Sequence, residues 1–240
     1  MAVLAAHEVS VSFGGLRALV DVDLEVGEGQ LVGLIGPNGA GKTTFIDAIT
    51  GFVRSRGRVK LDGRELSSLP PHARARLGLA RTWQSVELFD DLTVLENLTV
   101  IAPRRSLPTK AEESLALFGL ELLAGAMPSE LSQAQRKVVG LARALAAEPR
   151  IVCLDEPAAG LDVNESEELG RRLRGLVDAG TAILLVDHDM GLVLGISDHV
   201  VALEFGKVIA SGPPDTVRRD PQVVTAYLGG AAVEVAAAQP

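Results

Sequence analysis

Between an apolar run and a segment with helical spacing, the sequence reads Gly36-Pro37-Asn38-Gly39-Ala40-Gly41-Lys42-Thr43-Thr44. These residues form the complete G-x-x-x-x-G-K-T pattern of a phosphate-binding loop. The glycines let successive backbone N–H groups turn toward phosphates, Lys42 supplies a cation to the β- and γ-phosphates, and Thr43 offers a hydroxyl to Mg²⁺. The pattern therefore predicts a site for a nucleoside triphosphate.

The flanking segments favour this interpretation over a glycine-rich surface turn. Residues 31–35 are a short apolar run suited to a strand buried on both faces. After the loop, residues 45–50 place apolar side chains at helical spacing, and Gly51 can end that helix. We therefore expect the strand–loop–helix setting that a phosphate-binding loop requires.

Length and composition predict one compact α/β unit. The chain has 240 residues, of which 47% are hydrophobic and 22% charged, and its net charge of −8 disfavours nucleic acid as a partner. Its longest apolar runs fall far short of the roughly 18 residues that a membrane-spanning helix needs, and residues 1–7 lack a signal-peptide pattern. We expect a cytosolic protein or a soluble subunit at a membrane, with its single cysteine, Cys153, buried in an apolar run.

The arrangement of predicted elements indicates a P-loop α/β fold in several parts. Alternating residues at 8–13 and 19–26 predict an N-terminal antiparallel β subdomain. Apolar runs at 151–154 and 181–186, separated by a helical stretch at about 163–177, predict a parallel-sheet core. Residues 87–147 read mostly as helices and predict an inserted helical subdomain. We expect a single domain over residues 1–230, followed by an alanine-rich flexible tail at 231–240.

Acidic and histidine side chains follow the buried strands of this predicted core. Asp155 and Glu156 come directly after the run 151–154. In a P-loop fold this is the place for a Mg²⁺-associated aspartate, and the neighbouring glutamate can act as general base toward water. His188 follows the next buried strand, at the sheet edge where open α/β sheets bind ligands, so a γ-phosphate contact is expected.

Several motifs in order give the chain a family resemblance. The set comprises the phosphate-binding loop, Gln84, Leu131-Ser132-Gln133-Ala134-Gln135, Leu154-Asp155-Glu156-Pro157, Ala159-Gly160-Leu161-Asp162 and His188. From about residue 4 to residue 229, this order resembles the nucleotide-binding subunit of an ATP-binding cassette (ABC) transporter. The resemblance implies an ATPase with ATP and Mg²⁺ as its ligands.

The same resemblance implies roles for individual residues. Phe13 would stack on adenine, Gln84 would sense Mg²⁺ and the transmembrane partner, and Ser132 with Gln135 would reach the γ-phosphate in the opposite subunit. Asp162 would lie at the dimer interface. His188 would hold the γ-phosphate, and Thr43, Gln84 and Asp155 would be associated with the metal.

One motif departs from the family pattern. The family's signature loop is usually L-S-G-G-Q, whereas Gln133 and Ala134 occupy both glycine positions here. Ser132, Gln135 and the helix start that follows still offer a hydroxyl and N–H groups to a phosphate. Side chains at both positions restrict close approach of the backbone, which leaves a nucleotide-binding subunit with weakened hydrolysis as an alternative.

Further stretches are similar to the ATP-binding subunits of branched-chain amino-acid importers. They are residues 13–18, 80–84, 93–98, 156–161, 188–190, 195–198 and 226–229. This similarity implies integral-membrane permease subunits, a second ATP-binding subunit that is identical or related, and indirectly an extracytoplasmic solute-binding protein. It places the chain peripherally on the cytoplasmic face of the cell membrane, with branched-chain amino acids or related small solutes as cargo.

Other functions remain open on the sequence alone. A soluble ABC ATPase acting on ribosomes or DNA would normally bring two cassettes, a coiled-coil insertion or a basic surface. A small-molecule P-loop kinase would not require the glutamine, signature and histidine motifs. For a transporter subunit, Val86, Leu88 and Phe89 could form an apolar docking patch for the permease, or could equally be subdomain core.

Overall fold

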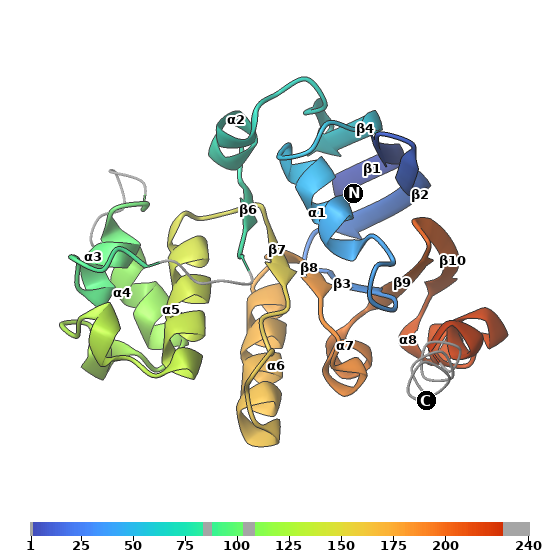
Figure 1. The fold of residues 1–240 in the computed structure, drawn as a ribbon. Helices are drawn as coiled ribbons and strands as arrows, with labels where there is room; N and C mark the ends of the chain where they lie inside the picture. Colours follow the sequence, from blue (N-terminus) through green and yellow to red (C-terminus); the bar gives the residue numbers. More distant parts are fainter. Residues whose placement is uncertain (1, 84–87, 103–108, 228–240) are drawn as a thin grey trace, which may run out of the picture.

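The structure is a computed structural model that describes residues 2–83, 88–102 and 109–227. Its strands form two sheets. An antiparallel sheet has the order β2-β1-β4-β5, and a second sheet has the order β10-β9-β3-β8-β7-β6. In the second sheet β9, β3, β8, β7 and β6 run parallel, and β10 pairs antiparallel with β9. The described residues thus contain the predicted N-terminal antiparallel sheet and the predicted parallel core (Figure 1).

The strands have the following bounds: β1 Ala2–Phe13, β2 Leu16–Gly27, β3 Leu31–Ile35, β4 Arg56–Leu61, β5 Arg64–Glu65, β6 Leu79–Arg81, β7 Ile151–Asp155, β8 Ala182–Val186, β9 His199–Glu204 and β10 Lys207–Gly212. The helices are α1 Lys42–Thr50, α2 Pro71–Arg76, α3 Val94–Thr99, α4 Thr109–Leu117, α5 Gln133–Ala146, α6 Val163–Asp178, α7 Met190–Ile196 and α8 Pro214–Arg218, with 3-10 turns at Glu121–Leu123 and Pro128–Glu130. A further helix covers residues 221–227.

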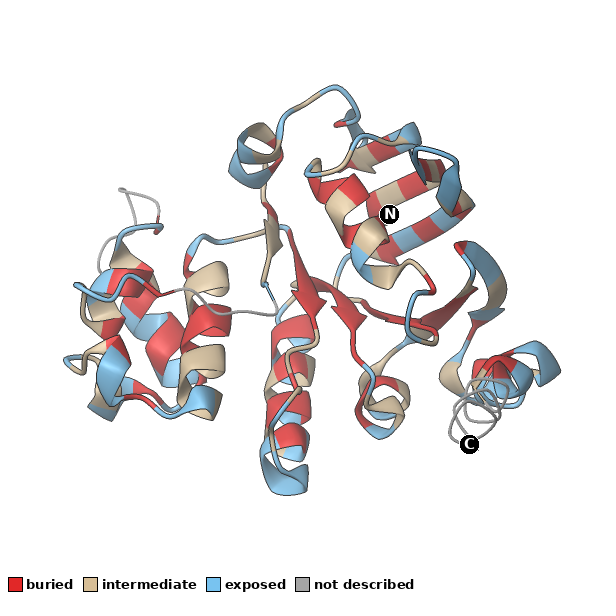
Figure 2. Cartoon of the chain, viewed as in Figure 1, coloured by how far each residue is buried: buried red, intermediate tan, exposed pale blue. Residues whose placement is uncertain are grey.

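The central strands separate two hydrophobic cores. Leu31 and Ile35 of β3 face a core that contains α5, α6 and α7, whereas Val32 and Leu34 face a core shared with α1 and the antiparallel sheet. All five residues of β3 are buried, and the same holds for β7 and β8 (Figure 2). A strand buried on both faces must be apolar at every position, which explains why these runs do not alternate.

The helices α3, α4 and α5 form a group at one side of the molecule (Figure 1). Ser132 caps α5: its hydroxyl accepts the N–H of Gln135 at 3.1 Å, and Gln135 Oε1 accepts the N–H of Ser132 at 2.8 Å. The interior of the group is apolar and continues into the core beneath the sheet. Leu88 belongs to this core, whereas Phe89 is half exposed.

Candidate functional site

The phosphate-binding loop joins β3 to α1, as the sequence predicts. Gly41 caps α1 with φ 106°, and Gly51 ends the helix with φ 87°. Both angles lie in the left-handed region, where glycine carries no steric cost. The N-terminal end of α1 therefore points its unpaired N–H groups into the loop, which is the ordinary arrangement for binding an anion.

Lys42 lies over the loop that it belongs to. Its ammonium donates to the carbonyl oxygens of Gly36 at 2.6 Å and Pro37 at 3.1 Å. Burial lowers the pKa of Lys42, and the nearby carboxylates of Glu156 and Asp155 oppose that shift. Phosphate oxygens would replace the two carbonyls as acceptors for this ammonium.

Asp155 is the last residue of β7, and its carboxylate is almost completely buried. Its Oδ2 lies 3.7 Å from Arg81 Nη2, while its Oδ1 has no hydrogen-bond partner among the described residues. Burial raises the pKa of Asp155, and the guanidinium of Arg81 partly offsets the shift. A buried carboxylate oxygen without a partner fits a group that a hard cation would satisfy.

Glu156 follows in an uncommon backbone conformation. Its φ is 51°, in the left-handed region that side chains other than glycine rarely adopt. The conformation is held because its N–H donates to the carbonyl of Val186, at the end of β8, at 2.7 Å. Such strained residues gather at functional sites, where neighbouring contacts fix a side chain in one direction.

A buried carboxylate connects the loops that follow β7 and β8. The two oxygens of Asp187 accept the N–H groups of Ala158 and Asp189, each at 3.0 Å. His188 lies between these contacts, with Nδ1 3.4 Å from Asp187 Oδ1, and its side chain is 64% exposed. Asp187 thereby fixes the loop that begins with Glu156 relative to the one that carries His188.

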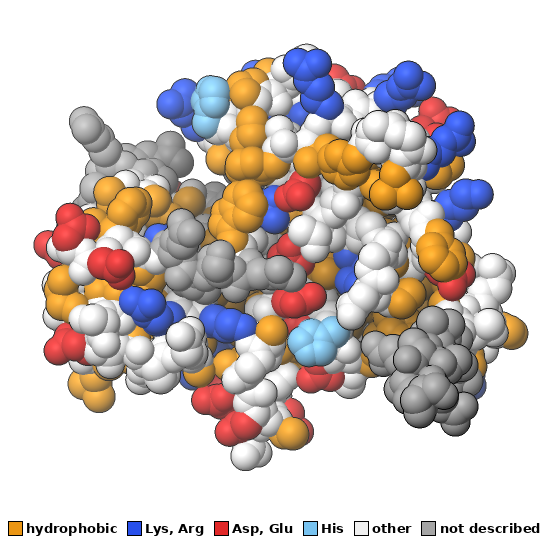
Figure 3. All heavy atoms as spheres, viewed as in Figure 1, with side chains coloured by type: hydrophobic (Ala, Val, Ile, Leu, Met, Phe, Trp, Pro, Cys, Tyr) orange, Lys and Arg blue, Asp and Glu red, His pale blue; other side chains and the backbone are white. Residues whose placement is uncertain are grey.

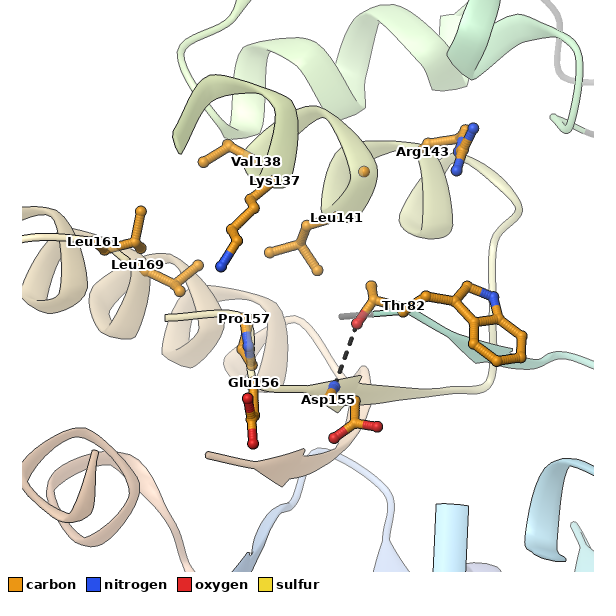
Figure 4. A pocket seen from close by; sticks show the side chains of 12 residues that line it. Thr82, Lys137, Val138, Leu141, Arg143, Asp155, Glu156, Pro157, Leu161 and Leu169 are labelled. Carbon is orange, nitrogen blue, oxygen red and sulfur yellow. Dashed lines mark hydrogen bonds between the residues drawn. The ribbon is translucent and has the colours of Figure 1, made fainter. Parts of the chain in front are cut away.

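The helical group contacts this region through α5. The ammonium of Lys137 donates to the carbonyl of Ala159. In Figure 4 Lys137 reaches from α5 toward the residues that follow β7, and Leu141 points into the pocket between them. Thr82 completes the opposite wall, where its hydroxyl accepts the N–H of Asp155 at 3.4 Å.

The structure brings some predicted residues together and leaves others apart. The order β3-β8-β7 and their parallel direction place the phosphate-binding loop, His188 and the Asp155–Glu156 pair at one edge of the sheet. Ser132 and Gln135 hydrogen-bond to each other and cap α5, and Asp162 caps α6 by accepting the N–H of Glu165 at 2.9 Å.

One further predicted residue belongs to the antiparallel sheet, and another lies outside the described residues. Phe13 ends β1 with half of its surface exposed, so its ring is open to stacking. Gln84 lies outside the residues that the structure describes, as does Val86.

Sequence reasoning missed Arg81 and the bridging role of Asp187. Arg81 Nη1 lies 2.5 Å from Asp47 of α1, and its guanidinium stacks on the ring of Trp83 at 3.7 Å from the centroid and near that of Phe52 at 5.5 Å. The sequence signal for this ion pair is an arginine directly after the apolar residues Leu79 and Ala80, because a charge that becomes buried requires a partner. The sequence does not identify those partners.

A groove lies between α2 and α5, beside β6. Its walls include the exposed aromatic side chains of Phe52 and Trp83, Ile101, and the basic side chains of Arg76 and Arg143. The rings of Phe52 and Trp83 meet edge to face, with centroids 4.8 Å apart. Hydrophobic side chains gather on this part of the surface (Figure 3).

Two family models match parts of the chain. A model of the ABC transporter family matches residues 19–159. A model described as a branched-chain amino acid ATP-binding cassette transporter matches residues 207–233.

Curated relatives match over nearly their whole length. The chain is 38% identical to BraF, a high-affinity branched-chain amino acid transport ATP-binding protein of Pseudomonas aeruginosa, over 95% of this chain and 98% of that protein. LivG of Salmonella typhimurium, with the same description, is 39% identical over the same shares. LptB of Escherichia coli, a lipopolysaccharide export system ATP-binding protein, is 36% identical, again over 95% and 98%.

Solved structures have the same fold. A nucleotide-free ATP-binding cassette from an ABC transporter superposes with a TM-score of 0.85 at 31% identity, over 95% of this chain and 99% of that chain. The ADP conformation of an ATP-binding cassette superposes with a TM-score of 0.86 at 30% identity over the same shares.

Proposed function

The chain belongs to the ABC transporter family of ATP-binding, ATP-hydrolysing subunits, and from this premise we propose that it drives an importer for branched-chain amino acids or related small solutes. The observation that carries the proposal is the full-length similarity to BraF and LivG, joined to the match of residues 207–233 with the branched-chain model. The similarity to LptB, an ATP-binding protein of a lipopolysaccharide export system, makes the cargo the part of the proposal that needs testing.

In the proposed reaction, Lys42 exchanges its two carbonyl partners for the β- and γ-phosphates of ATP. The backbone N–H groups from Gly39 to Thr44 cradle the phosphates, and Phe13 stacks on the adenine. Thr43 and Asp155, together with Gln84, would hold Mg²⁺, which would neutralise charge on the phosphate oxygens. The unpartnered Oδ1 of Asp155 supports this assignment.

Glu156 is proposed as the general base, and His188 as the residue that holds the γ-phosphate. The bond from the Glu156 N–H to Val186 and the Asp187 bridge keep both side chains at the edge where the phosphate-binding loop lies. A base held in this way accepts a proton from water without first reorganising, which is how positioned carboxylates accelerate hydrolysis.

A second ATP-binding subunit is proposed to complete the site. Ser132 and Gln135 stand at the positive end of the α5 dipole, and the side chain of each accepts the backbone N–H of the other. Presented to the γ-phosphate of a partner, this helix start would add N–H groups and a hydroxyl to the site. Loss of the γ-phosphate then removes the charge that favours closure of the two halves.

The permease is proposed to dock in the groove between α2 and α5. Phe52 and Trp83 offer apolar surface there, and Arg143 adds positive charge. Leu88 does not contribute to a docking patch because it lies in the core, whereas Phe89 remains exposed. This docking would hold the chain at the cytoplasmic face of the membrane. No helix in the described part of the chain is both long and apolar enough to cross a bilayer.

We propose that residues 1–230 work as one ATPase domain. Its helical subdomain, at about 87–147, would transmit the motion between nucleotide and permease through the Lys137–Ala159 contact. The tail at 231–240, which lies outside the described residues, is assigned no part in this chemistry.

The deciding experiment uses Glu156→Gln, with Glu167→Gln on the exposed face of α6 as the matched control. Hydrolysis by Glu156→Gln should fall by roughly two or more orders of magnitude with ATP binding retained, as expected for loss of a general base, whereas the control should match the unsubstituted protein. Full turnover in Glu156→Gln would remove this residue from the mechanism.

The partners are tested with the same variant. Tagged Glu156→Gln is purified from detergent-solubilised membranes with Mg-ATP, and bound proteins are identified by mass spectrometry. Recovery of permease subunits supports the transporter, and uptake of labelled leucine by the reconstituted complex tests the cargo. Recovery of ribosomal or DNA-associated proteins alone would favour a soluble ABC ATPase.

A further inference from the structure

The C-terminal part of the chain makes a direct hydrogen bond to the phosphate-binding loop. The N–H of Gly36, the first residue of the loop, donates to the hydroxyl oxygen of Tyr227 at 2.8 Å. The two residues are 191 positions apart in the sequence. Tyr227 is partly buried and packs against the core beneath the sheet, and burial raises the pKa of its hydroxyl, which therefore stays neutral near pH 7.

The turn between β9 and β10 holds the same loop at its other end. The N–H of Gly206 donates to the carbonyl of Ala40 at 2.9 Å, and the carbonyl of Gly206 accepts the N–H of Val20 at 2.8 Å. At the start of the loop, a Cβ on Gly36 would collide with the carbonyl oxygen of Leu203 in β9. The C-terminal third of the chain therefore contacts the loop at both ends.

The backbone N–H and the carbonyl of Gly36 behave differently in the proposed binding of nucleotide. The carbonyl accepts Lys42 Nζ at 2.6 Å, and in the proposed reaction Lys42 gives up this bond for the phosphates. The N–H, which bonds to Tyr227, takes no part in that exchange. Tyr227 is thus the contact that holds the start of the loop while Lys42 changes partners.

We propose that Tyr227 is a positioning residue for nucleotide binding, whose hydroxyl keeps the phosphate-binding loop in its binding shape. The inference rests on the proposed ATP site and adds to it a residue of the C-terminal segment that holds the loop in shape. A loop already held in shape loses less conformational freedom when it binds, which strengthens binding without a contact to the ligand itself. The consequence is specific: the hydroxyl of Tyr227 should affect ATP affinity more than turnover.

The test compares two substitutions that each remove one hydroxyl from the helix at 221–227. Tyr227→Phe keeps the ring and deletes the bond to Gly36. Thr225→Val deletes a hydroxyl that, among the described residues, bonds to the carbonyl of Pro221 in the same helix, at 2.7 Å. Affinity for a fluorescent N-methylanthraniloyl ATP is measured in EDTA, so that no metal contributes, and KM and kcat are measured separately with Mg-ATP.

Tyr227→Phe should raise the Kd for nucleotide and the KM by roughly three- to tenfold, the effect of one lost hydrogen bond, with kcat within about twofold. Hydrogen exchange of the peptide that contains Gly36 should gain one faster amide, and Thr225→Val should change none of these quantities. The exchange measurement reports on the bond even if Tyr227→Phe also lowers stability.

A lower unfolding temperature in Tyr227→Phe with unchanged Kd and KM would overturn the proposal, because Tyr227 would then only anchor its helix. Equal loss of affinity in Thr225→Val would overturn it as well. Failure of the unsubstituted protein to bind the ATP analogue would instead contradict the proposed ATP site, so the two ideas fail by different results.

Discussion

Replacing Asp187 by asparagine should both destabilise the protein and displace Glu156 and His188, which lie on the loops that Asp187 connects. Each carboxylate oxygen of Asp187 accepts one backbone N–H, from Ala158 and from Asp189, at 3.0 Å. Asparagine can accept only one of them. Its amide N–H₂ would face the other backbone N–H in a site that is only 1% exposed, so two donors would meet without an acceptor.

The magnitude follows from these contacts. A hydrogen bond to a charged group contributes about 1.5–3 kcal/mol, and a buried donor left without a partner carries a comparable penalty. Since the neutral amide is cheaper to bury than the carboxylate, we expect a net loss of about 2–3 kcal/mol in the free energy of unfolding. In a chain of this size that loss corresponds to a fall of roughly 5–10 °C in Tm.

The matched control is Asp189→Asn, two residues further on. Asp189 Oδ1 accepts the N–H of Leu192 at 3.0 Å as the cap of α7, and Oδ2 accepts the hydroxyl of Ser166 at 3.2 Å. Asparagine caps helices as well as aspartate does, and the hydroxyl of Ser166 can rotate to accept from the new amide. This variant should therefore unfold within about 0.5 kcal/mol of the unsubstituted protein.

Urea denaturation and steady-state ATPase measurements test both effects. Asp187→Asn should lower kcat by about tenfold or more, because Glu156 and His188 stand on the two loops that Asp187 connects and small displacements are costly. Equal unfolding free energies for Asp187→Asn and Asp189→Asn would refute the bridge. Lowered stability with full kcat would show that the bridge does not position Glu156 and His188 for hydrolysis.

Three other predictions concern the loops and the core. Changing Gln133 and Ala134 together to glycine should raise ATPase activity if their side chains limit approach to a partner's phosphate; phosphate release that stays the same or falls would show that the loop works as built. Burial raises the pKa of Cys153 to about 12, so a thiol reagent should label it only after unfolding in guanidinium, and rapid labelling of the native protein would contradict the burial. Gly36→Ala should lower the free energy of unfolding by about 3 kcal/mol or more, since its Cβ would meet a carbonyl oxygen of β9. Gly39→Ala, at φ 79° with no atom within 4 Å of the added Cβ, should lower it by about 1 kcal/mol. Both are measured by unfolding without nucleotide, and equal losses for the two variants would contradict the prediction.

Much of the fold was predictable because its signals are local. The run at 31–35, the glycine loop and the helix that ends at Gly51 occur as expected, as does the helix start beside Ser132. The parallel strand expected at 151–154 extends by one residue to Asp155. Alternation and capping depend on neighbours within four residues, so the sequence alone carries them.

The features that the sequence did not predict are contacts between residues far apart along the chain. The sequence marked Asp187 only as a neighbour of His188, and the structure shows it bridging to Ala158. Arg81 forms an ion pair with Asp47 of α1, and the hydroxyl of Tyr227 accepts the N–H of Gly36 from 191 positions further along the chain. Each depends on strand order and on how two cores pack, which periodicity does not encode.

The sequence by itself determined the chemistry of the phosphate-binding loop. Its glycines, Lys42 and Thr43 are adjacent along the chain, so covalent geometry and allowed backbone angles bring them together. Only the tertiary structure decided which other side chains join them. Packing of apolar residues on both faces of β3, β7 and β8 fixes the order and direction of these strands, and through them the positions of Asp155, Glu156 and His188. These contacts depend on the total apolar surface that the whole chain buries on folding, and a short stretch of sequence does not determine that total.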